Sequence, residues 1–206
     1  MTFKRTNKII VLDVDETLVH TGDDDRIKKL NIFSNIEHIR LRPRIFKFPL
    51  YGYKNEKDYS GIMRPNLDKF LNWCHEYFRL VILWSAGEDT YVKKIVECLY
   101  KNGYPKFDYI FTREFCDIKN MCKPLSKIYE QIPAANDKNT IIIDDLKRNF
   151  MFNERNGLLI PAYDPKETIE DFKRDDDTFI KIMDWFETKE VIESKDVKSL
   201  KFPDLF

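Results

Sequence analysis

Several absences narrow the classes of protein to which this sequence can belong. The 206 residues carry 35 acidic and 35 basic side chains, so no net charge draws the chain to nucleic acid or to a membrane surface. No apolar run approaches the roughly 20 residues that cross a bilayer, and the N-terminus has no apolar signal-peptide core. The four cysteines form no CxxC pair and no zinc-type cluster with the 3 histidines. With only 6 glycines, the composition is that of an ordered globular protein.

These absences set the expected environment and the excluded partners. We expect a soluble protein with reduced thiols in the nucleus or the cytoplasm, those of the host cell if the chain is viral. We expect no direct binding to nucleic acid and no attachment to a membrane. The oligomeric state is left open by the sequence.

What the sequence does contain is a regular alternation of short apolar runs and amphipathic segments. Apolar runs at 9–12, 80–84 and 140–143 are typical of buried strands. Between them, apolar residues recur at helical spacing over 66–78 and 88–101. This alternation predicts an α/β fold, in which helices cover both faces of a parallel, Rossmann-like sheet.

The segments outside this alternation define the expected domain organisation. Residues 1–206 form one domain, into which residues 21–63 insert a small β-rich unit. Apolar and charged residues interleave from 37 to 53, which predicts hairpin strands there. Residues 188–206 are weakly periodic and form either a docked terminal helix or a tail.

Polar side chains follow three of the predicted strands. Asp13 and Asp15 follow the first strand, Ser85 follows the second, and Asp144 and Asp145 follow the third. Ligands bind beyond the carboxyl ends of parallel strands, so we expect these side chains at one site. Two neighbouring carboxylates repel each other unless one is protonated or a cation faces both, and Mg²⁺ prefers oxygen ligands. A carboxylate can also attack phosphorus, so the pattern indicates magnesium-dependent phosphoryl transfer.

The run IIVLDVDETLVH, residues 9–20, resembles the first motif of the haloacid dehalogenase superfamily, a strand followed by DxDx[TV]. Its wording is most similar to the phosphatases that act on the C-terminal domain of RNA polymerase II. These include small and Dullard-like relatives and are also called NLI-interacting-factor-like phosphatases. Later segments resemble further motifs of this branch in the expected order: RPNLDKFL from Arg64, LVILWSAGEDTY from Leu80, CKPLSKI at 122–128, IIIDD at 141–145 and NGLLIPAYD at 156–164.

The resemblance implies a role for each residue of the site. Asp13 would be the nucleophile and a metal ligand. Asp15 would protonate the leaving oxygen, then activate water, and would bind Mg²⁺ through its backbone carbonyl. Thr17 would brace the loop, Ser85 would donate a hydrogen bond to a phosphoryl oxygen, and Lys123 would neutralise charge on the phosphoryl group.

The resemblance also implies ligands from the fourth motif and a groove for the substrate. Asp145 would ligate Mg²⁺, with Asp144 beside it or acting through water; on the residues alone, the two acids could instead cap a helix. Ser85 could likewise cap the helix that follows its strand. Tyr91 either lines a substrate pocket or packs in the core. Glu88 stands where the small phosphatases have an aliphatic residue that helps to hold a substrate proline, so it would weaken an apolar proline pocket.

The leading interpretation is a phosphatase that forms an aspartyl-phosphate and acts on phosphoserine or phosphothreonine in a protein or peptide. The C-terminal domain of RNA polymerase II is one candidate substrate. Two alternatives stay open. One is a phosphatase of the same superfamily for small molecules or nucleic-acid ends, and the other is an inactive relative that serves as a scaffold. The complete set of Asp13, Asp15, Lys123 and Asp145 argues against the scaffold.

Overall fold

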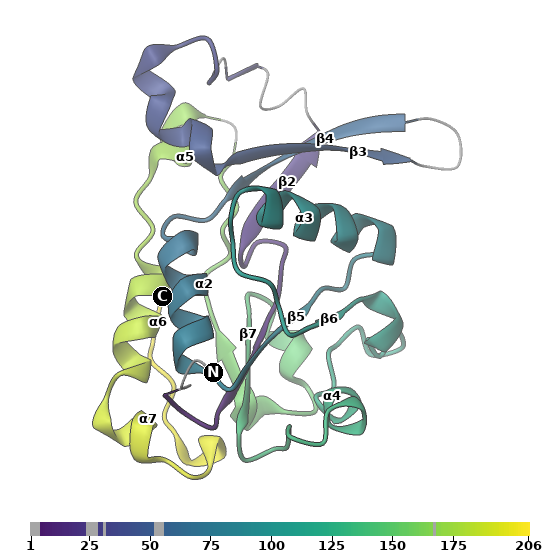
Figure 1. The fold of residues 1–206 in the computed structure, drawn as a ribbon, viewed down its shortest axis with the longest axis vertical. Helices are drawn as coiled ribbons and strands as arrows, with labels where there is room; N and C mark the ends of the chain where they lie inside the picture. Colours follow the sequence, from purple (N-terminus) through teal and green to yellow (C-terminus); the bar gives the residue numbers. More distant parts are fainter. Residues whose placement is uncertain (1–4, 24–28, 31, 52–55, 167) are drawn as a thin grey trace.

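A computed structural model describes residues 5–23, 29–30, 32–51, 56–166 and 168–206. The molecule is built around a five-stranded sheet in the order β6–β5–β1–β7–β8, whose paired strands all run parallel (Figure 1). The predicted α/β fold with a parallel sheet is therefore confirmed. The strands are β1 (Ile9–Leu12), β5 (Leu80–Trp84), β6 (Tyr109–Phe111), β7 (Thr140–Asp144) and β8 (Gly157–Leu159).

Strand β1 lies at the centre because its four apolar residues are buried on both faces of the sheet. Ile10 and Leu12 point into a core under three helices, and Ile9 and Val11 point into a second core on the opposite face. No helix in the described part of the chain has the length and hydropathy needed to cross a bilayer. The covering helices are α2 (Leu67–Tyr77), α3 (Asp89–Lys101) and α6 (Thr178–Phe186) on the first face, and α4 (Ser126–Gln131) on the second.

A smaller antiparallel sheet, in the order β2–β4–β3, follows the loop after β1. Its strands are β2 (Val19–Asp23), β4 (Glu56–Met63) and β3 (Ile45–Tyr51). Figure 1 shows this second sheet lying over α3. Phe46 and Phe48 join the same core as α3, and the ring of Phe48 lies 6.1 Å from that of Tyr91. This packing sets the second sheet beside the carboxyl end of β1.

The stretch before β3 differs from the predicted hairpin. Residues Ile36–Arg44 form a 3₁₀ segment, η1, whose first turn is closed by the side chain of Asn35, which accepts from the Glu37 amide at 2.9 Å. His38 and Leu41 are buried at a spacing of three residues, which a 3₁₀ turn brings to one side. The strand prediction was wrong for residues Ile36–Arg44, because interleaved apolar and charged residues fit the three-residue spacing of a 3₁₀ helix as well as the alternation of a strand.

The C-terminal residues pack against the main domain through short elements. Helix α7 (Lys189–Glu193) and the 3₁₀ turn η5 (Val197–Ser199) bury Val191 and Val197 in the core under α2 and α6. The Val197 amide donates to the Lys138 carbonyl at 2.8 Å. Residues Lys189–Glu193 and Val197–Ser199 thus contact the core through one short helix and one 3₁₀ turn.

Candidate active site

The residues that follow β1 and β7 meet at the carboxyl edge of the parallel sheet. The amide of Asp13 donates to the Ile143 carbonyl at 3.0 Å, which continues the pairing of β1 with β7 beyond the last residue of β1. As a result, Asp13 lies beside Asp144 and Asp145. One carboxylate oxygen from each of these three residues lies within 4.8 Å of the others. The sequence prediction that the acids of the first and fourth motifs converge agrees with this geometry.

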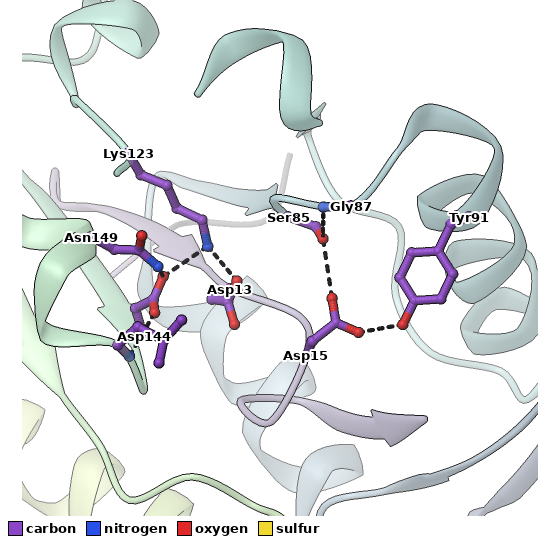
Figure 2. A network of polar contacts seen from close by, with 9 residues as sticks. Asp13, Asp15, Ser85, Gly87, Tyr91, Lys123, Asp144 and Asn149 are labelled. Carbon is purple, nitrogen blue, oxygen red and sulfur yellow. Dashed lines mark hydrogen bonds and ion pairs between the residues drawn. The ribbon is translucent and has the colours of Figure 1, made fainter. Parts of the chain in front are cut away.

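Lys123 joins the acidic cluster from the loop before α4. Its ammonium donates to Asp13 Oδ1 and, at 2.7 Å, to Asp144 Oδ2 (Figure 2). The Lys123 side chain is 1% exposed and that of Asp144 is wholly buried. Burial alone would favour a neutral amine, but the negative charges of Asp13 and Asp144 outweigh it and raise the pKa of Lys123. The side chain therefore remains a cation at the point where the two acids meet.

Asp144 is held in place by three donors. Its Oδ2 accepts from Lys123 and from the Asn149 side chain, each at 2.7 Å, and its Oδ1 accepts from the Leu146 amide at 2.9 Å. Asn149 belongs to the 3₁₀ turn η3 (Lys147–Phe150) and was not among the residues predicted from the sequence. A single asparagine in a polar turn carries no pattern that would single it out. The turn after β7 thus fixes Asp144, and Asp144 fixes the ammonium of Lys123.

The charges of the cluster fit a divalent cation. Three carboxylates and one ammonium leave two negative charges when all are ionised. Burial, followed by the charge of Asp144, raises the pKa of Asp145 to about 6. Burial also raises the pKa of Asp13 well above its usual value, against the attraction of Lys123. Two uncompensated negative charges on buried oxygen ligands suit a hard divalent cation.

The side chain of Asp15 points away from the cluster toward α3 (Figure 2). Ser85 Oγ donates to Asp15 Oδ2 at 3.3 Å, and the Tyr91 hydroxyl donates to Asp15 Oδ1. Ser85 Oγ also accepts from the Gly87 amide at 2.9 Å. The N-cap position of α3 is Glu88, so Ser85 closes the turn before the helix and does not cap it. Burial raises the pKa of Asp15, and the hydrogen bond from Tyr91 opposes that rise.

The loop from Asp13 to Val19 is shaped mainly by backbone contacts. Glu16 has φ of 57°, and its amide donates to the Val19 carbonyl at 2.8 Å. The carbonyl of Thr17 accepts from the buried guanidinium of Arg64 at 3.3 Å. Thr17 Oγ1 is buried and has no hydrogen-bond partner among the described residues. Bracing by the Thr17 hydroxyl therefore stays a prediction, and the observed support comes from Arg64.

An open groove of about 460 Å³ adjoins Asp15. At its rim, Glu88 and Arg113 form an exposed ion pair with an N–O distance of 3.1 Å, and such exposed pairs stabilise a fold very little. Both substrate-binding candidates from the sequence, Tyr91 and Glu88, line this groove, whereas Arg113 was not predicted. The full lining is Asp15, Leu50, Tyr59, Ala86, Gly87, Glu88, Tyr91 and Arg113.

Comparisons with known proteins identify similar sequences along most of the chain. The sequence model of the family described as NLI interacting factor-like phosphatase matches residues 8–198. The chain is 31% identical over 112 residues to the ubiquitin-like domain-containing CTD phosphatase 1 of Danio rerio, covering 50% of this chain and 35% of that protein. It is 26% identical over 173 residues to the CTD nuclear envelope phosphatase 1 homolog of Caenorhabditis elegans, covering 82% of this chain and 63% of that protein.

Solved structures show the same fold. The structure of Fcp1, an essential RNA polymerase II CTD phosphatase, has a TM-score of 0.64 at 16% sequence identity, covering 91% of this chain and 52% of that chain. A fission yeast RNA polymerase II CTD phosphatase bound to beryllium fluoride gives 0.63 at 16% identity and covers 53% of that chain. At this identity the likeness concerns the fold alone. The present chain thus spans about half the length of these structures.

Proposed function

Since the chain belongs to the family of NLI interacting factor-like phosphatases, we propose that it is a magnesium-dependent phosphatase for phosphoserine or phosphothreonine in proteins. The observation that carries this proposal is the contact of Lys123 with both Asp13 and Asp144 inside the acidic cluster. A nucleophilic carboxylate next to a fixed cation and a cation-binding set is the equipment that phosphoryl transfer requires.

The reaction proceeds in two displacements at phosphorus. In the first, a carboxylate oxygen of Asp13 forms a bond to phosphorus, the bond between phosphorus and the ester oxygen breaks, and Asp15 gives its proton to that oxygen. The alcohol leaves and an aspartyl-phosphate remains. In the second, the carboxylate of Asp15 takes a proton from water, the water oxygen attacks phosphorus, and the bond to Asp13 breaks. Inorganic phosphate leaves and Asp13 is restored.

The negative charge of the phosphoryl group is compensated both by side chains of the protein and by the bound metal ion. Lys123 and Ser85 donate to phosphoryl oxygens, and the site is buried enough for such contacts to be strong. Mg²⁺, held by Asp13, Asp145 and the Asp15 carbonyl with Asp144 beside them, would neutralise charge on the phosphoryl group. Asp144 already accepts from three donors, which supports a role in holding Lys123.

A protein substrate is favoured by the shape of the surface beside Asp15. The groove is open and is lined by both the second sheet and α3, so it can receive residues that flank a phosphorylated side chain. The C-terminal domain of RNA polymerase II is a candidate because similar proteins are named for it. Glu88 at the rim disfavours an apolar proline pocket and points to flanking residues of different chemistry.

Phosphate release from matched substrates tests this proposal. Phosphoserine and phosphothreonine peptides, nucleotides and DNA 3′-phosphates are compared at equal concentration with Mg²⁺, and Asp13→Asn serves as the inactive control. Faster release from the peptides is the expected result. Rapid release from nucleotides or DNA ends with none from peptides would favour a small-molecule or nucleic-acid-end phosphatase, and no release from any substrate would favour a scaffold.

A further inference from the structure

The hydroxyl of Tyr91 is the middle of a three-residue hydrogen-bond chain. Thr21 Oγ1 on β2 lies 2.7 Å from the Tyr91 hydroxyl oxygen. The Tyr91 hydroxyl in turn donates to Asp15 Oδ1, as Figure 2 shows. The single proton of Tyr91 goes to Asp15, so Thr21 is the donor in the other contact. Burial, and next the charge of Asp15, raises the pKa of Tyr91, which keeps that proton on the phenol. The second sheet and α3 thus act together on one carboxylate.

This hydrogen-bond chain makes the two carboxylate oxygens of Asp15 unequal. Among the described residues, Tyr91 donates to Oδ1, whereas the side-chain donor to Oδ2 is Ser85, at 3.3 Å. Ser85 is also the residue expected to turn its hydroxyl to a phosphoryl oxygen. When it does, Asp15 Oδ1 still accepts from Tyr91, and Oδ2 is released from Ser85 and can carry the proton for the ester oxygen. Tyr91 therefore sets which oxygen carries the transferred proton.

Packing of the ring alone does not require this hydroxyl. The ring lies against Phe48 of β3 and against the turn at Gly87, where an added Cβ would approach Tyr91 Cδ1 to 2.7 Å. A phenylalanine would fill the same space. The same ring also forms part of the groove wall beside Asp15. One rigid side chain thus touches both the substrate groove and the acid–base carboxylate.

We propose that Tyr91 is a positioning residue that orients Asp15 for proton transfer. The inference rests on the proposed function, because it assigns to Asp15 the proton transfer of that mechanism. It predicts that loss of the Tyr91 hydroxyl harms the protonation of the leaving oxygen more than it harms substrate binding.

A series of substituted phenyl phosphates of similar shape isolates the protonation step. Their leaving groups differ in basicity, and kcat/KM reports the steps up to formation of the phosphoenzyme. A strongly basic leaving group depends on general-acid help, whereas the p-nitrophenolate group hardly does. For Tyr91→Phe we expect kcat/KM to fall about tenfold with phenyl phosphate and less than about twofold with p-nitrophenyl phosphate. We expect KM to change little, since the ring remains.

Two further variants complete the experiment. Thr21→Val removes the donor to Tyr91 and is expected to give a smaller change in the same direction. Tyr100→Phe is the matched control, because Tyr100 lies on the same helix and its hydroxyl accepts from the Phe107 amide at 3.1 Å, a contact with no part in the proposed mechanism. We expect it to leave the leaving-group dependence unchanged.

The outcomes separate this inference from the proposed function. An active wild type whose Tyr91→Phe variant loses the same factor across the series, or loses only affinity, would overturn the positioning role and leave the phosphatase intact. A wild type with no magnesium-dependent turnover of any phenyl phosphate would overturn both. A steeper dependence on leaving-group basicity in Tyr91→Phe alone and, more weakly, in Thr21→Val supports the inference.

Discussion

Replacing Lys123 by methionine should destabilise the metal-free protein and make its stability depend strongly on Mg²⁺. The side chain is 1% exposed and is the cation that faces both Asp13 and Asp144, of which Asp144 is wholly buried. Methionine fills a similar volume but leaves these acids without a cation. Removing one partner of a buried ion pair destabilises a protein by about 3–5 kcal/mol. Total stabilities of native domains are about 5–15 kcal/mol, so we expect Lys123→Met to stay folded but to unfold at markedly lower urea concentration.

Mg²⁺ should restore part of this loss, because a divalent cation supplies the charge that the variant lacks. The measurement is urea unfolding with EDTA and with Mg²⁺, in parallel with the control Lys127→Met. Lys127 is about half exposed and lies 3.8 Å from Glu130, and such surface pairs contribute at most about 1 kcal/mol. The reasoning would be refuted by a loss of less than about 1 kcal/mol for Lys123→Met in EDTA, or by equal effects of Mg²⁺ on the variant and the wild type.

Other expected outcomes concern the nucleophile, the metal and the ion pair between Arg5 and Glu187. Asp13→Asn should lose more than about 10³-fold in kcat without loss of stability, since Lys123 keeps Asp144; a smaller loss in a pure sample would contradict this. EDTA should abolish turnover and added Mg²⁺ restore it, and turnover that persists after metal removal would exclude the proposed site. The pKa of Glu187 is lowered: burial acts against this shift, but the hydrogen bonds from Arg5 outweigh it. The resulting stability is present above the unfolded-state pKa of 4.5 and is lost as the pH falls through the lower folded-state value. Glu187→Gln should therefore flatten the acid limb of stability measured by urea unfolding from pH 2 to 7, and an unchanged limb would disprove the assignment.

The sheet could be predicted from the sequence because its strands are continuous apolar runs. Burial on both faces leaves no competing period, so 9–12, 80–84 and 140–143 fall within one residue of β1, β5 and β7. The stretch at Ile36–Arg44 failed because a short amphipathic segment supports a 3₁₀ turn as readily as a strand. The local sequence pattern predicts the structure correctly where tertiary contacts favour the same form. It fails where the pattern fits two forms and tertiary contacts select between them.

The residues of the site likewise include some that the sequence could predict and some that it could not. Asp13, Asp15, Asp144 and Asp145 could be predicted because each follows a strand at the sheet edge, and Lys123 was reached only through the family resemblance. Figure 2 shows what the sequence could not reveal, such as the contact of Tyr91 with Asp15 and that of Asn149 with Asp144. These contacts link α3 to the loop after β1 and η3 to the end of β7, and no spacing pattern in the sequence marks the residues that make them.

Trapping the covalent intermediate tests the central claim most directly. The protein is denatured during turnover of a phosphoserine peptide with Mg²⁺ and treated with borohydride, which reduces an aspartyl-phosphate to homoserine. Mass spectrometry of the peptide that contains Asp13 then locates the modified residue. We predict homoserine in place of Asp13 in the wild type and none in Asp13→Asn. Active enzyme that yields no homoserine, or homoserine at another aspartate, would contradict attack by Asp13 on phosphorus.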